Sequence, residues 1–231
     1  MSSNPPLLLL RLEGPLQSWG LRARWDVRDS GDEPSKSGVI GLLGCAFGFT
    51  RGDPRLAELD RETHLGIRAE REGTPMVDFQ TITGLLPRAD GKVKGSLDEP
   101  ATIVSPRAYL QDAAFLVILG GARDLLERSA AALQAPRWPV YLGRKSCLPS
   151  RPVFDRISFD FGSVREALAG APWDWLGRRD EDAPFGRLRC VLEDPEGEAV
   201  RADALLEQPA RMYGNRRVTT FWVDAPTGKE F

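Results

Sequence analysis

The chain has 231 residues, of which 42% are hydrophobic, so it is long and apolar enough to bury a core, which argues against disorder. Its 31 basic and 33 acidic residues give a formal charge of −2, which excludes a general attraction to nucleic acid or anionic membranes and requires any polyanion site to be local. Three scattered cysteines and one histidine cannot supply a zinc site, so we expect a reduced protein without metal or cofactor.

The first predicted element is a buried strand at residues 7–12, which ends at Gly14-Pro15. Its apolar run is too short for a signal sequence or a membrane span, so we expect a cytoplasmic chain with no membrane partner. The next loop interleaves Trp19 and Trp25 with arginines, a combination that suits stacking on unpaired bases and pairing with phosphates. A packed tryptophan with surface arginines is the alternative. The arginines are Arg22, Arg24 and Arg28.

Residues 34–49 predict a helix with a polar, cationic start and an apolar body. Each glycine inside a helix costs about 1 kcal/mol relative to alanine, so Gly38, Gly41 and Gly44 require a reason. Their spacing gathers them near one face, where another backbone can come close. The helix start exposes N–H groups that favour an anion such as phosphate, with simple capping as the alternative. The candidate residues there are Ser35, Lys36 and Ser37. The glycine spacing matches no nucleotide-binding motif.

Residues 65–71 alternate in polarity and predict a second strand, with His64 at its start as a surface residue more than a base. Residues 80–110 predict a long projecting β-hairpin, with Asp90-Gly91 in its turn. The basic residues at its tip either contact nucleic acid or are simply solvated. They are Arg88, Lys92 and Lys94.

A strand at 113–119, an amphipathic helix at 123–133 and a short strand at 140–142 follow. The turn after them is basic, because the stretch from Arg137 to Arg151 contains four basic residues and no acidic one. A glycine followed by Arg-Lys-Ser supplies close backbone approach, charge and donors, as phosphate contacts require. An exposed basic turn is the alternative. The candidate residues are Tyr141, Gly143, Arg144 and Lys145.

The order strand, helix, strand, hairpin, strand, helix, strand is the βαββαβ pattern of a ferredoxin-like domain, which RNA-recognition domains share. We therefore predict an α+β fold, with a ferredoxin-like domain over residues 1–152 that carries the hairpin as an insertion. Residues 153–231 predict a smaller β-rich region, with strands at 186–192 and 217–223. Its excess of acidic residues suits a contact with protein more than with RNA.

Three blocks carry a family resemblance: residues 10–20 (LRLEGPLQSWG), 34–44 (PSKSGVIGLLG) and 141–147 (YLGRKSC). Together, and in this order, they resemble the CasD family, the small RAMP-type subunit of the type I-E CRISPR Cascade. The resemblance covers most of residues 7–155. It implies a noncatalytic RNA-binding subunit in antiviral defence that holds the 5′ handle of the CRISPR RNA (crRNA) and caps the backbone filament. The implied partners are the adjacent backbone RAMP subunit, which the hairpin (thumb) would touch, and the large target-recognition subunit.

The resemblance also implies which residues contact the handle. They fall in the loop after the first strand, the helix start, the hairpin root and the basic turn: Arg22, Arg24, Ser35, Lys36, Ser37, Arg107, Tyr109, Tyr141, Gly143, Arg144 and Lys145. One departure from the family concerns Arg107, which stands between Pro106 and Ala108 instead of a polar or aromatic pair. Because proline cannot donate a hydrogen bond within a sheet, this difference bears on the Arg107 contact.

Two other functions stay open at this point. A metal-independent endoribonuclease that processes CRISPR repeat RNA would need a base near the attacking 2′-hydroxyl. The candidates for that base are Tyr109, Tyr141, Lys145 and His64, although no histidine lies in the three blocks. A protein-only interaction module would use the basic turns merely as solvated surface, and it predicts no salt-dependent affinity for RNA.

Overall fold

The computed structural model describes residues 4–21, 28–88, 90–176, 186–206 and 213–226. Its centre is a seven-stranded sheet in the order β11-β12-β10-β3-β8-β1-β9, in which every neighbouring pair is antiparallel. Within the described ranges, no helix has the length and apolar composition that crossing a bilayer requires. The strands are β1 (Leu7–Glu13), β3 (His64–Arg71), β8 (Ala114–Gly120), β9 (Phe154–Ser158), β10 (Arg187–Glu193), β11 (Ala199–Leu205) and β12 (Tyr213–Asp224).

All of β8 and the first four residues of β1 are apolar because both faces of the sheet are covered. Leu8 and Leu10 of β1 pack against one core, whereas Leu7 and Leu9 pack against the other. The first core lies under α1 (Lys36–Phe47), α2 (Pro54–Glu62) and α3 (Arg123–Gln134), and the second lies under α4 (Val164–Gly170). The continuous leucine run at the start of the chain therefore reflects a strand buried on both sides.

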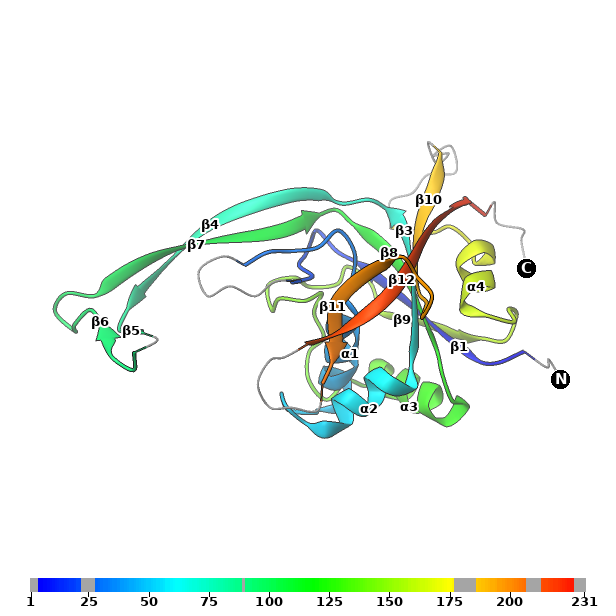
Figure 1. Cartoon of the computed structure of the whole chain (residues 1–231), viewed down its shortest axis with the longest axis horizontal. Coiled ribbons are helices and arrows are strands. Elements are labelled where there is room, and N and C mark those ends of the chain that lie inside the picture. Colours follow the sequence, from blue (N-terminus) through cyan, green and yellow to red (C-terminus); the bar gives the residue numbers. More distant parts are fainter. Residues whose placement is uncertain (1–3, 22–27, 89, 177–185, 207–212, 227–231) are drawn as a thin grey trace.

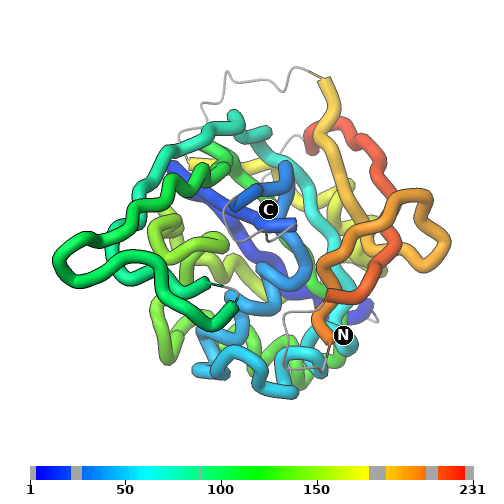
Figure 2. Tube along the Cα trace, turned by 60° about the vertical axis from the view of Figure 1, so that its left-hand side comes forward, coloured from blue at the N-terminus to red at the C-terminus, as the bar shows by residue number. Residues whose placement is uncertain are grey.

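A long hairpin leaves this body, as Figures 1 and 2 show. Its arms are β4 (Thr74–Gly84) and β7 (Ala101–Gln111), and β2 (Leu16–Gln17) pairs with the root of β7. Two short strands, β5 (Leu86–Pro87) and β6 (Val93–Lys94), form the tip. The prediction of a projecting hairpin at 80–110 is confirmed, but the hairpin begins earlier because Thr74 already pairs with Gln111.

The predicted strand at 140–142 is wrong. These residues lead into a tight loop in which the Leu142 N–H donates to the Cys147 carbonyl at 2.7 Å and the Cys147 N–H to the Arg144 carbonyl at 2.9 Å. The strand beside β1 is instead β9. The predicted boundary between residues 152 and 153 thus falls just before β9, and strands from both sides of that boundary share one sheet.

Candidate RNA-binding interface

The start of α1 is as polar as the sequence predicts, but its anion position is already occupied. Ser35 is the N-cap and accepts the Gly38 N–H at 3.3 Å. The Lys36 backbone N–H donates to the Asp203 carboxylate of β11 at 2.7 Å, and Arg216 binds the same carboxylate at 3.0 and 2.8 Å. A phosphate predicted at this helix terminus would therefore meet a carboxylate that fills its place.

The Lys36 side chain points into the protein. Its ammonium donates to the Thr63 carbonyl at 3.0 Å and to Glu193 Oε1 at 2.9 Å, and it lies 3.8 Å from Asp60. Burial raises the pKa of Asp60, against the opposing effect of the Lys36 charge. The expected contact between Lys36 and RNA must therefore be corrected, because the ammonium is buried and ion-paired.

The three glycines on one face of α1 have different surroundings. A Cβ at Gly38 would lie 2.8 Å from the Trp19 ring, and one at Gly44 would lie 2.5 Å from Leu56 Cδ2. Side chains, not another backbone, come close at these two positions. A Cβ at Gly41 would meet nothing within 4 Å. Gly41 is thus the one of the three that faces open space.

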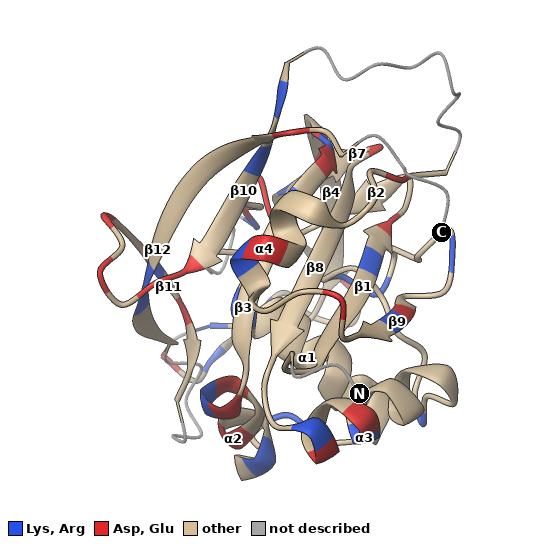
Figure 3. Cartoon of the chain, turned by 90° about the vertical axis from the view of Figure 1, so that its right-hand side faces the viewer, with Lys and Arg blue, Asp and Glu red and all other residues tan. Residues whose placement is uncertain are grey.

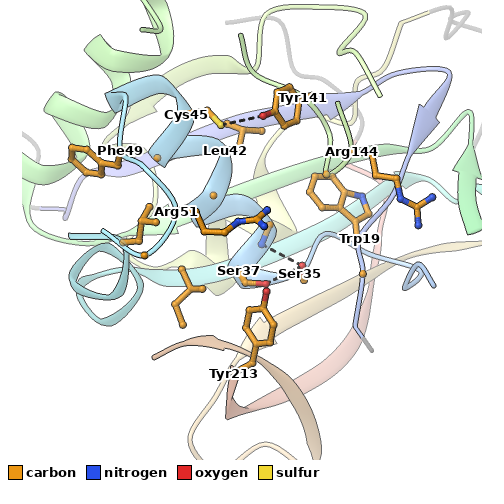
Figure 4. A pocket seen from close by; sticks show the side chains of 18 of the residues that line it. Trp19, Ser35, Ser37, Leu42, Cys45, Phe49, Arg51, Tyr141, Arg144 and Tyr213 are labelled. Atoms are coloured by element: carbon orange, nitrogen blue, oxygen red, sulfur yellow. Dashed lines mark hydrogen bonds between the residues drawn. The ribbon is translucent and has the colours of Figure 1, made fainter. Parts of the chain in front are cut away.

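That open space is a pocket of about 590 Å³ over the glycine face of α1 (Figure 4). Ser37 lies at its helical wall, beside Ser35, whose hydroxyl is 3.5 Å away. Trp19 stays in the core, 1% exposed, and its indole N–H donates to Gln17, so the packed alternative for this residue holds. The aromatic and basic residues that line the pocket are Trp19, Phe49, Trp138, Tyr141, Tyr213, Arg28, Arg51 and Arg144.

Arg144 joins three segments at the edge of the pocket. Its guanidinium donates to the carbonyls of Ala108 and Arg28 at 2.9 Å each and of Asp29 at 3.3 Å. It also lies over the Tyr109 ring, 4.6 Å from the centroid. The structure therefore brings Arg144 and Tyr109 together, as two of the predicted site residues, but Tyr109 is only 4% exposed and both hold the hairpin root in place.

The other residues of the basic turn have two roles: Gly143 and Tyr141 pack against the protein, whereas Lys145 is an exposed charge. A Cβ on Gly143, which has a φ of 89°, would lie 1.8 Å from the Ser18 carbonyl oxygen, so the close approach predicted here is to the protein's own chain. The Tyr141 hydroxyl accepts the Cys45 thiol at 3.8 Å, and burial raises the pKa of Tyr141. Lys145 is exposed and has no ion pair with any residue in the described ranges.

The sequence reasoning missed Arg51. It follows α1 directly, its side chain is exposed, and it forms no ion pair within the described part of the chain. Figure 4 shows it extending across the pocket toward the first turn of α1. The signal that could have found it is its place in Arg51-Gly52-Asp53-Pro54, a turn that immediately follows the glycine helix.

The hydrogen bonds at the hairpin root accommodate Pro106. The Arg28 N–H donates to the Pro106 carbonyl at 3.0 Å, and the Ala108 N–H donates to the Arg28 carbonyl at 2.7 Å. Pro106 contributes only its acceptor, so its missing N–H costs nothing here. Arg107 is half-buried, and its Nε has no hydrogen-bond partner among the described atoms.

The remaining candidates lie elsewhere. Arg22 and Arg24 fall outside the described residues. Arg88 pairs with Asp90 at 3.3 Å at the hairpin tip, where Lys92 and Lys94 are exposed. Figure 1 shows this tip far from α1. His64 lines a second cavity of about 400 Å³ near the start of α4. Burial lowers the pKa of His64.

Comparisons with known proteins agree on one family. The family described as CRISPR-associated protein (Cas_Cas5) matches residues 7–219. The chain is 33% identical to the CRISPR system Cascade subunit CasD of Escherichia coli (strain K12) in an alignment 159 positions long, which covers 64% of this chain and 69% of that protein.

Two solved structures are similar over nearly the whole length. A chain of a CRISPR RNA-guided surveillance complex superimposes with a TM-score of 0.75 at 34% identity and covers 95% of this chain and 91% of its own. A second structure, described as a crystal structure of a Cas protein, has a TM-score of 0.68 at 36% identity, over 96% and 98% of the two chains. The chain therefore belongs to the CRISPR-associated protein (Cas_Cas5) family.

Proposed function

We propose that this chain is a noncatalytic RNA-binding subunit of a CRISPR surveillance complex of the Cascade type, in which it holds the 5′ handle of the crRNA and caps the backbone filament. The observation that carries the site is the pocket over Gly41, whose rim has exposed arginines that form no ion pair with any described residue. The relatives support the assignment, since one is named a Cascade subunit and another belongs to an RNA-guided complex. A cytoplasmic location fits this role.

The proposed contact set differs from the one that the sequence predicts. Lys36 is no longer included because it is buried, and Ser35 acts as a helix cap. The new members are Arg28, Gly41 and Arg51, which line the pocket. Tyr109 and Gly143 act by holding the surrounding backbone. The residues proposed to face RNA are Arg22, Arg24, Arg28, Ser37, Gly41, Arg51, Arg107, Tyr141, Arg144 and Lys145.

We further propose that β1, α1, β3, β8, α3 and β9 form the ferredoxin-like unit. Their order along the chain is βαββαβ, and their four strands are neighbours in the order β3-β8-β1-β9, which supports the assignment. In this view β10, β11 and β12 extend the unit from β3.

The hairpin is the proposed contact with the backbone subunit. Val77 and Phe79 are 58% and 74% exposed, and they share one face of the hairpin with Val104 of the opposite arm. Such an apolar stripe on a projecting arm is typical of a surface that another protein covers. The large target-recognition subunit is the second proposed protein partner.

Nuclease activity is the less favoured alternative. Two of the candidate bases, His64 and Tyr109, do not face the pocket over Gly41. His64 lines a different cavity, and Tyr109 is buried beneath Arg144. Incubating the purified chain with CRISPR repeat RNA in EDTA tests this directly. We expect a mobility shift with intact RNA, and site-specific cleavage would overturn the noncatalytic assignment.

The binding role is tested with the RNA that copurifies with the complex and with charge reversals. We expect one uniform 5′ end derived from the repeat. Arg51→Glu with Lys145→Glu should weaken the binding of a repeat-derived single-stranded RNA, and the difference from the wild type should shrink at high salt.

Arg128→Glu is the matched control, since Arg128 is exposed on α3, which contributes no residue to the pocket. Figure 3 shows that α3 carries charges of both signs. If the double variant at Arg51 and Lys145 binds the RNA with the same affinity as the wild type, the proposed RNA-binding site is wrong.

A further inference from the structure

The C-terminal strands supply one wall of the pocket over Gly41. Leu205 ends β11, Tyr213 begins β12, and the two residues pair directly across the ladder. Leu205, Leu206 and Tyr213 all line the pocket, as do Trp19 and Arg144. Figure 4 shows the Tyr213 side chain pointing toward Ser37 in the first turn of α1.

Tyr213 is an exposed aromatic ring at the mouth of this apolar wall. Its exposed fraction is 44%, and within the described residues it forms no ring contact and no side-chain hydrogen bond. Leu206 beside it is equally exposed, at 44%. An aromatic ring with an open face is the platform on which unpaired bases stack.

The pocket suits an uncharged flat group better than a phosphate. Asp203 already occupies the helix terminus that would attract an anion, and Asp29 and Asp53 also line the pocket. Arg28 and Arg51 are exposed and form no ion pair within the described ranges, so a phosphate fits at the rim. The volume of about 590 Å³ falls in the range of pockets that hold small ligands.

The geometry points to one unpaired RNA base, which we infer enters the pocket over Gly41 and stacks on Tyr213, while its sugar and phosphate stay at the rim near Arg51. This inference rests on the proposed function and gives the C-terminal strands a role in it. A base can enter only from a single strand, because pairing and stacking hold the bases of a duplex in place.

Abasic scanning tests the inference. A labelled single-stranded RNA with the sequence of the repeat-derived handle is made with one abasic site at each position in turn, and its Kd for the full chain is measured by fluorescence anisotropy. We expect one position at which loss of the base weakens binding about fivefold or more, the loss expected for a single stacked base. Tyr213→Leu should weaken binding of the intact RNA to a similar degree, and in that variant the same abasic site should have no further effect.

One control variant changes another residue of β12, and a second makes a milder change at Tyr213 itself. Trp222 is another exposed aromatic residue of β12, 55% exposed, and it does not line the pocket, so Trp222→Leu should leave Kd unchanged. Tyr213→Phe keeps the ring and should retain the wild-type affinity. A measurement without any variant is the fluorescence of 2-aminopurine at the sensitive position, which stacking on Tyr213 should quench on binding.

The outcomes separate the two proposals. If the chain binds the intact RNA, three results would each overturn the base pocket and leave the proposed RNA binding intact. They are an abasic scan with no sensitive position, a Tyr213→Leu variant that binds as the wild type does, and 2-aminopurine fluorescence that binding does not quench. Failure of the wild-type chain, free and in its complex, to bind the handle RNA overturns the proposed function itself and the base pocket with it.

Discussion

The Lys36 ammonium lies 2.9 Å from the Glu193 carboxylate, and this contact joins the first turn of α1 to β10 in the C-terminal part of the chain. The Asp203 carboxylate makes a second link to the same turn through the Lys36 backbone N–H. The helix that forms the floor of the pocket is therefore held at its start by the C-terminal strands. The cation at the helix start therefore pairs with carboxylates of the protein itself.

Replacing Lys36 with methionine should destabilise the fold by about 3 kcal/mol, because the change leaves the Glu193 and Asp60 carboxylates without their shared cation. Urea unfolding followed by circular dichroism measures the effect. Lys145→Met is the matched control: its side chain is exposed, so it should change stability by no more than about 0.5 kcal/mol. Equal stability of the two variants would contradict the buried role of Lys36.

Asp60 should give the stability a distinct pH dependence. Burial raises the pKa of its carboxyl above the ordinary 3.8, so the folded state holds the proton to a higher pH than the unfolded state does. Between these two pKa values the folded state binds more protons, and the contribution of Asp60 to stability falls as the pH rises. Relative to the wild type, Asp60→Asn should therefore become more stable as the pH rises above 3.8. A difference that stays constant with pH would show that the Asp60 pKa is the same in both states.

Gly41 can be filled without harm to the fold. Gly41→Ala should raise stability by up to about 1 kcal/mol, because alanine favours the helix interior and nothing lies within 4 Å of the new Cβ. Gly41→Leu should keep the fold and lower RNA affinity about fivefold or more, since its side chain occupies the space proposed for a base. Thermal unfolding and anisotropy measure the two effects.

Gly38→Leu is the contrasting variant, because its Cβ would lie 2.8 Å from Trp19. It should lower the melting temperature, since a buried ring must move. If Gly41→Leu binds RNA as the wild type does, the floor of the pocket is not part of the RNA site.

How well the sequence predicts an element depends on whether burial of that element leaves a regular pattern of apolar residues. Period-two alternation and apolar runs locate β1, β3 and β8 well, and apolar residues at helical spacing locate α3, because burial of one face leaves these patterns in the sequence. The segment 140–142 has the composition of a strand but lies in a tight loop, since its hydrogen bonds go to Cys147 and Ser18. Local composition does not show such partners.

The site was harder to predict than the fold for the same reason. The fate of Lys36 depends on Glu193, which lies 157 residues away along the chain, and no local pattern distinguishes a buried lysine from an exposed one at a helix start. Arg51 and Tyr213 enter the pocket only because the fold brings a turn and a distant strand to the same helix. The glycine spacing did mark the correct helix face, although only Gly41 is open on it.

Cys45 offers a chemical probe of the pocket. It lines the pocket and is partly exposed, whereas Cys147 and Cys190 are buried, and burial raises the pKa of Cys190 to about 12. N-ethylmaleimide at pH 7.5 should therefore modify Cys45 first, because thiolates react and buried thiols do not. Bound handle RNA should slow this reaction, as peptide mass spectrometry measures. A rate that RNA does not change would place the RNA outside the pocket, and Cys45→Ser identifies the labelled site.

Arg144 should prove sensitive even to a change that keeps its charge. Lysine cannot donate to the carbonyls of Ala108, Arg28 and Asp29 together, and it does not stack on Tyr109 as a planar guanidinium does. Arg144→Lys should therefore cost about 1–2 kcal/mol of stability. It should also speed hydrogen exchange of the Ala108 amide, whose partner is the Arg28 carbonyl. Lys145→Ala, one residue along the same turn, should lower RNA affinity without either effect. If Arg144→Lys instead leaves both the stability and the exchange of the Ala108 amide unchanged, Arg144 does not hold the hairpin root in place.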